Sequence, residues 1–190
     1  MNRLYDEGQS RQAIAAEADR LLKFTAVPTG SAIDLGPDLP LAVFTSTERW
    51  HPERIGALAI YCSDGRWGEA FDEFCHKHLQ IPRYDRLALA GGPAWLAEPE
   101  GGSELSRAVR DQLDFLIRVH ELGQIVLITH YGCAHYGHLL GQPPRECLPA
   151  QCADVRAAAA QLRARYPEIA VDGYLAMRRE NYLSFHRLAT

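Results

Sequence analysis

The sequence lacks any long apolar segment. No window reaches about 18 consecutive apolar residues, which is close to the length that a membrane-spanning helix needs. The N-terminal stretch MNRLYDEGQSRQAIAAEADRLL has no apolar core of the kind found in secretory signal peptides. No run of lysine and arginine is present and the net charge is −4, which argues against nucleic acid and anionic membranes as partners. We therefore expect a soluble cytoplasmic protein.

The sequence also lacks an even set of cysteines. There are 5, in a chain of 190 residues. A chain of this size buries roughly 70% of the surface of its unfolded form and needs no disulfides for stability. An odd number of thiols in such a chain indicates a reducing compartment, with cysteines used singly or as metal ligands.

The N-terminal quarter differs from the rest of the chain. Residues 9–24 have the spacing of an amphipathic helix, and the stretch AVPTGSAIDLGPDLP that follows is broken by prolines and glycines. We expect a helical arm with an irregular linker over 1–50, and one α/β domain over 51–190.

The larger part alternates between strand and helix patterns. Segments with the pattern of strands are 55–62, 84–92, 123–130, 169–179 and 182–188. Helical patterns separate the first four: one follows Arg66, one is capped by Ser103, and one covers 148–167. The tight turn RREN makes the last strand antiparallel to the one before it. This order predicts a three-layer α/β/α fold with a mainly parallel sheet.

Two distinctive stretches, YCSDGRW at 61–67 and THYGCAHYG at 129–137, follow the ends of predicted strands. Because the carboxyl ends of parallel strands meet at one edge of a sheet, Cys62 and His130 should lie close together. Cys133 stands where a new helix should begin, and a helix N-terminus favours the thiolate. Two thiolates and one imidazole suit zinc, and three protein ligands leave the open position of a catalytic site.

Asp64 and Arg66 occupy the turn directly after Cys62. A carboxylate two residues past a ligand can reach the fourth zinc position or a water bound there. A guanidinium two residues further on can hold that carboxylate in a fork.

Together, CSDGR and HYGC resemble the Cys-x-Asp-x-Arg and His-x-x-Cys signatures of the β-class carbonic anhydrases, and the resemblance runs from about Ile55 to Leu188. It implies Zn²⁺ on Cys62, His130 and Cys133, with Asp64 and Arg66 as the catalytic pair. The implied fold has a four-stranded parallel sheet and a fifth, antiparallel strand. The implied assembly is a homodimer in which the N-terminal helix packs on the partner.

The activity that this resemblance implies is that of a zinc lyase. It is the reversible hydration of carbon dioxide to bicarbonate by a metal-bound hydroxide, which Asp64 orients while Arg66 keeps Asp64 ionised and off the metal. In the family's inactive state Asp64 takes the fourth zinc position itself.

The sequence departs from the family at two places. Ala134 and His135 stand where the family has two glycines or a glycine and a small residue, and AGGP lacks the asparagine of Ala-Gly-Asn. Two other functions therefore stay open. One is hydrolysis of another small linear molecule, carbonyl sulfide or carbon disulfide, at the same site. The other is a zinc-binding scaffold or regulator without turnover.

A different interpretation of THYGCAHYG is a cysteine nucleophile, with Cys133 attacking and His130 or His135 as the base. That interpretation leaves CSDGR unexplained. We expect His135 and His138 to be imidazoles at the surface or beside the ligands. The remaining cysteines are expected in three places: Cys75, with His78, in the core, Cys152 on an apolar helix stripe, and Cys147 in a loop without an evident partner.

Overall fold

A computed structural model describes residues 20, 42–51 and 53–189. The chain divides into two compact units, Met1–Arg54 and Ile55–Thr190. The helix predicted over 9–24 lies outside the described residues, except that Arg20 is helical. Residues 42–51 form neither helix nor strand.

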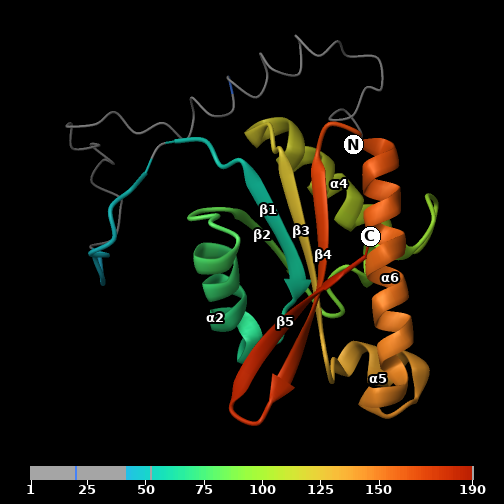
Figure 1. The fold of residues 1–190 in the computed structure, drawn as a ribbon. Coiled ribbons are helices and arrows are strands. Elements are labelled where there is room, and N and C mark those ends of the chain that lie inside the picture. The colour runs from blue at the N-terminus through green and yellow to red at the C-terminus, as the bar shows by residue number, and fades with distance from the viewer. Residues whose placement is uncertain (1–19, 21–41, 52, 190) are drawn as a thin grey trace. The chain divides into compact units, whose positions relative to one another are not determined.

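A five-stranded sheet forms the centre of the second unit, with the strand order β2-β1-β3-β4-β5 (Figure 1). The strands are β1 Ala57–Cys62, β2 Asp85–Leu89, β3 Gln124–His130, β4 Ala170–Arg179 and β5 Tyr182–Leu188. The first four are parallel, and β5 pairs antiparallel with β4. The predicted sheet is confirmed. Its central strands β1 and β3 are almost wholly buried, as expected for strands that are covered on both faces.

Helices cover both faces of this sheet, which confirms the three layers (Figure 1). On one face lie α2, Gly65–Glu73, and the π-helical turn η1, Phe74–His78. Their core is aromatic, and the rings of Phe74 and Phe185 stack with centroids 4.1 Å apart. On the other face lie α4, Glu104–His120, and α6, Pro144–Arg165, over an aliphatic core. Two short helices, α3 Ala94–Ala97 and α5 Ala134–Leu140, complete the unit.

Helix α6 begins at Pro144, one turn before the predicted start. Proline suits the first position of a helix because its missing N–H would have no partner there. The prediction that Cys147 lies in a loop was therefore wrong. Cys147 belongs to the first turns of α6, is 2% exposed and packs in one buried cluster with Cys62, Cys133 and Tyr136.

The prediction that Cys75 and His78 both lie in the core is correct only for Cys75. Cys75 is fully buried, whereas His78 is exposed and stacks its ring on Phe74 with centroids 5.2 Å apart. Both lie in η1, where the wider π-helical turn changes the spacing that a regular α-helix would give. Among the described helices, none is both long enough and apolar enough to cross a membrane.

Candidate metal centre

The ends of β1 and β3 bring together the residues that the sequence singled out as ligands. Cys62 is the last residue of β1 and His130 the last of β3, and these strands are neighbours in the sheet. Cys133 precedes α5, and the turn that leads to it passes through Gly132 at φ +72°, a conformation that favours glycine. The two sulfur atoms are 3.7 Å apart. One ligand atom from each of Cys62, His130 and Cys133 lies within 4.8 Å of the other two.

The imidazole of His130 is oriented for ligation. The side chain is fully buried, and its Nδ1 lies 3.0 Å from the carbonyl oxygen of Tyr131. A carbonyl only accepts, so Nδ1 carries the proton and Nε2 keeps its lone pair. Among the described residues Nε2 has no hydrogen-bond partner. An unprotonated, buried nitrogen beside two thiols is the donor set that zinc prefers, so these residues fit the metal.

Cys62 and Cys133 form a hydrogen-bonded pair that gives up one of its two thiol protons more readily than the other. The pKa of Cys62 is lowered chiefly because the Cys133 thiol donates a hydrogen bond to it, which outweighs the opposing effect of burial. The backbone N–H groups of Gly91 and Asp64 lower it further. The same hydrogen bond, together with burial, raises the pKa of Cys133. The pair therefore loses its first proton readily and retains the second, which a divalent cation would displace.

Asp64 and Arg66 form a fork beside the cluster. Arg66 Nε lies 2.9 Å from Asp64 Oδ1, and Nη2 lies 2.5 Å from Oδ2. Asp64 also caps α2, because its side chain accepts from the backbone N–H of Arg66 at 3.1 Å. These bonds from Arg66 lower the pKa of Asp64 to about 2. Asp64 is therefore an ionised acceptor at neutral pH.

A cavity of about 590 Å³ lies next to this fork. Arg66 and Trp67 line it from α2, and Tyr131 and Gly132 line it from the turn between His130 and Cys133. The Trp67 ring also packs on the imidazole of His130, with centroids 4.6 Å apart. Arg178, Glu180 and Leu183 of the β4–β5 hairpin complete the lining. The cavity therefore gives a small molecule a place beside Arg66 and the turn between His130 and Cys133.

Gln151 on α6 is a supporting residue that no sequence motif marks. It is fully buried, and its Nε2 donates to the His130 carbonyl at 2.8 Å and to Thr129 Oγ1 at 3.3 Å. It thus holds the end of β3 from the α6 side. A glutamine within a helical pattern carries no sequence signal of such a contact.

Tyr136 and Asp154 connect α5 to α6. The Tyr136 ring is 1% exposed, and its hydroxyl donates to Asp154 Oδ2 at 2.7 Å. Burial raises the pKa of Asp154 against the opposing effect of this hydrogen bond. The pair anchors the helix that follows Cys133, and it too was missed from the sequence.

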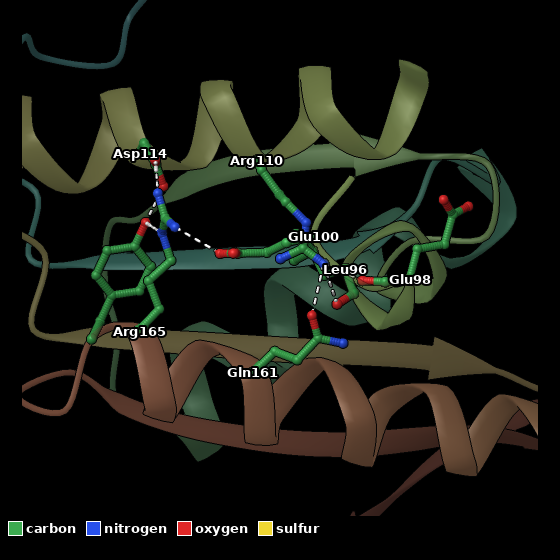
Figure 2. A network of polar contacts seen from close by, with 8 residues as sticks. Leu96, Glu98, Glu100, Arg110, Asp114, Gln161 and Arg165 are labelled. Carbon is green, nitrogen blue, oxygen red and sulfur yellow. Dashed lines mark hydrogen bonds and ion pairs between the residues drawn. The ribbon is translucent and has the colours of Figure 1, made fainter. Parts of the chain in front are cut away.

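The segment Gly91–Glu98 packs against the cluster through Ala94. Polar side chains from α4 and α6 hold it near Leu96 and Glu98 (Figure 2). Arg110 on α4 donates to the carbonyl of Leu96 at 3.1 Å, to that of Glu98, and to Gln161 Oε1 at 2.9 Å. Gln161 on α6 donates in turn to the carbonyl of Ala97 at 2.9 Å. The segment is therefore held from both helices.

His135 and His138 differ in environment. His138 is exposed on α5. His135 is half-buried, with its ring against Gly91 and 5.0 Å from that of Trp95. Among the described residues, the cluster that could hold a metal consists of Cys62, His130 and Cys133 alone.

The fold and the cluster define an α/β protein with a buried Cys–His–Cys group that could bind a metal ion. A family model described as "Putative carbonic anhydrase" matches residues 53–181, which is more than half of the chain. The chain belongs to this putative carbonic anhydrase family. The predicted relation to carbonic anhydrases is confirmed at that level.

Two solved structures are similar to the chain. One is the β-carbonic anhydrase CafA of Aspergillus fumigatus, with 17% identity, a TM-score of 0.40, and coverage of 73% of this chain and 78% of that one. The other is β-carbonic anhydrase isoform I of Trichomonas vaginalis, with 13% identity, a TM-score of 0.43, and coverage of 96% and 100%. None of the curated proteins compared with the chain matches it significantly.

Proposed function

We propose that the protein is a zinc lyase that hydrates carbon dioxide reversibly to bicarbonate. The observation that carries the proposal is the buried cluster itself. Nε2 of His130 has no hydrogen-bond partner among the described residues, and it lies beside two thiols whose sulfur atoms are 3.7 Å apart. Membership of the putative carbonic anhydrase family supports the choice of reaction.

Cys62, His130 and Cys133 would hold the zinc. When bound, zinc would act as a Lewis acid and lower the pKa of a water ligand, so that a nucleophile is available near neutral pH. Three protein ligands leave a fourth position for that water. Both sulfur atoms are nearly buried, since Cys62 is 7% and Cys133 5% exposed, which suits metal ligands better than nucleophiles that must meet a substrate.

Asp64 would orient the attacking water, because one of its carboxylate oxygens would accept a hydrogen bond from the O–H of that water. Arg66 serves this role in two ways. Its positive charge keeps Asp64 ionised, and its fork occupies the carboxylate oxygens and so keeps them from the metal. The cavity beside Arg66 and Gly132 would receive carbon dioxide and release bicarbonate.

The test combines metal analysis with kinetics. Purified protein should carry about one zinc per chain and hydrate carbon dioxide in a stopped-flow assay. Cys62→Ser should lose both, whereas Cys152→Ser, which alters a thiol outside the cluster, should retain both. Absence of zinc in the parent protein, or full zinc in Cys62→Ser, would refute the site. Zinc without carbon dioxide turnover would refute the reaction. Carbonyl sulfide and carbon disulfide assays would then separate another substrate from a scaffold.

A further inference from the structure

The imidazole of His135 occupies the space that a side chain at position 91 would take. A Cβ atom built on Gly91 would lie 2.4 Å from Cδ2 and 2.8 Å from Cγ of the His135 ring, far inside contact distance. Gly91 also has φ +86°, which side chains rarely adopt. The ring and the bare Cα are thus packed directly against each other. The edge contact of the ring with Tyr136, at 5.5 Å between centroids, holds it from the other side.

This contact joins α5, which follows Cys133, to the turn after β2. That turn lies next to β1 in the sheet and packs directly on Cys62, since a Cβ atom built on Gly92 would lie 2.8 Å from the backbone nitrogen of Cys62. The ring of His135 therefore packs against the turn that supports the residue carrying the opposite sulfur.

Groups that support a ligand hold it in the geometry that the metal requires, and their loss usually weakens metal binding. The turn after β2 supports Cys62 only while it stays in place. The His135 ring packs against this turn at Gly91, where a side chain would leave it no room.

We propose that His135 is a positioning residue of the metal centre, whose ring packs on Gly91 and keeps the turn after β2 in place against Cys62. This inference rests on the proposed function in so far as Cys62 is taken as a metal ligand. The role belongs to the shape of the ring and not to its proton. A planar, non-titrating ring at position 135 should therefore serve as well as imidazole.

The experiment loads the full chain with Co²⁺ or Zn²⁺ and measures affinity by competition with a chelator. The thiolate-to-cobalt charge-transfer band reports the sulfur environment directly, which mere loss of packing far from the sulfur would not move. The variants are His135→Ala, which removes the ring, His135→Phe, which keeps a ring without its nitrogens, and His138→Ala, an exposed histidine on the same helix.

His135→Ala should bind either metal about 10- to 100-fold more weakly, the usual cost of losing a residue that supports a ligand, and should shift the charge-transfer band. His135→Phe and His138→Ala should match the parent. If His135→Ala does not fold by circular dichroism, His135→Asn, which also lacks the ring, replaces it with the same expectations.

An unchanged affinity and band in the ringless variant would overturn the inference and leave the proposed function standing. Failure of His135→Phe to restore the parent values would overturn the packing role. A parent protein that binds neither metal would overturn the proposed function, and this inference with it.

Discussion

Arg66 holds both carboxylate oxygens of Asp64, with Nε 2.9 Å from Oδ1 and Nη2 2.5 Å from Oδ2. The side chain of Arg66 is 78% exposed, whereas that of Asp64 is 17% exposed. An exposed ion pair of this kind contributes little to stability. The main effect of the fork is therefore on Asp64, whose carboxylate it keeps ionised and in a fixed orientation. Its contribution to the stability of the turn is small.

Asp64→Asn should separate a catalytic role from a structural one. The amide carries no charge for Arg66 to hold and is a poorer acceptor for the proton of an attacking water. The three proposed zinc ligands remain. We expect full zinc content and a fall in kcat/KM of about 10²–10³-fold, as for loss of one positioned catalytic group. Zinc analysis and stopped-flow hydration from about pH 6 to 9 check this. If turnover survives unimpaired, Asp64 only caps α2.

Arg66→Ala should release Asp64 and change its titration. Hydrogen bonds from Arg66 are the main reason that the pKa of Asp64 is about 2, below its ordinary value of 3.8. A depressed carboxyl pKa contributes stability above the ordinary value, and this contribution is lost as the pH falls toward about 2. In Arg66→Ala that pH dependence should largely disappear. Carbon-detected NMR titration of the metal-free protein measures the midpoint, which should rise toward 3.8 in the variant.

The same variant should also lose activity, by a different route from Asp64→Asn. A carboxylate without its fork is free to ligate the metal and block the fourth position. Zinc content should therefore stay complete while hydration falls. An Asp64 midpoint that is the same with and without Arg66 would contradict this account of the fork.

The sequence predicted the sheet and the ligand cluster because both depend on local patterns. Apolar runs ending in Cys62 and His130 mark buried strands, and parallel strands bring their carboxyl ends together whatever the rest of the chain does. The supporting residues depend on tertiary contacts instead. Gln151 and Asp154 lie within a helical pattern, and only the packing of α6 shows what they touch.

The early start of α6 illustrates the same limit. Consecutive prolines and a cysteine at 143–147 have the composition of a loop, yet Pro144 can open a helix because its position needs no N–H. Burial of Cys147 against the ligand cysteines follows from that start. The spacing in η1 was missed for a comparable reason, since a π-helical turn leaves no periodic signal of its own.

Deletion of residues 1–30 tests the predicted dimer. The deleted stretch contains residues 9–24, whose spacing predicts an amphipathic helix with an apolar stripe that would pack on a second subunit. We expect the full chain to sediment as a dimer and the deleted chain as a monomer or an aggregate. A deleted chain that remains a dimer would refute a role for the predicted arm in assembly.

Arg110→Met should destabilise the fold through the segment beside the metal centre. Arg110 donates to the carbonyls of Leu96 and Glu98 and to Gln161 Oε1 (Figure 2). Methionine is similarly long and apolar, so it keeps part of the packing but leaves these acceptors without their charged donor. Because hydrogen bonds to a charged group contribute about 1.5–3 kcal/mol each, and partly buried acceptors can recruit water, we expect a loss of about 2–3 kcal/mol.

Urea denaturation measures this loss as a lower midpoint at an unchanged slope, the sign that stability and not the denatured state has changed. Arg107→Met is the matched control, because Arg107 lies one turn earlier on α4 and its guanidinium donates to one carbonyl among the described residues, that of Gly102, in an exposed contact. Its effect should stay within about 0.5 kcal/mol. Arg110 bonds the carbonyls of Leu96 and Glu98, which follow the turn that packs on Cys62. The Arg110 variant should therefore also hold zinc less tightly than the Arg107 variant. Equal stability in the two variants would show that the bonds of Arg110 do not fix this segment.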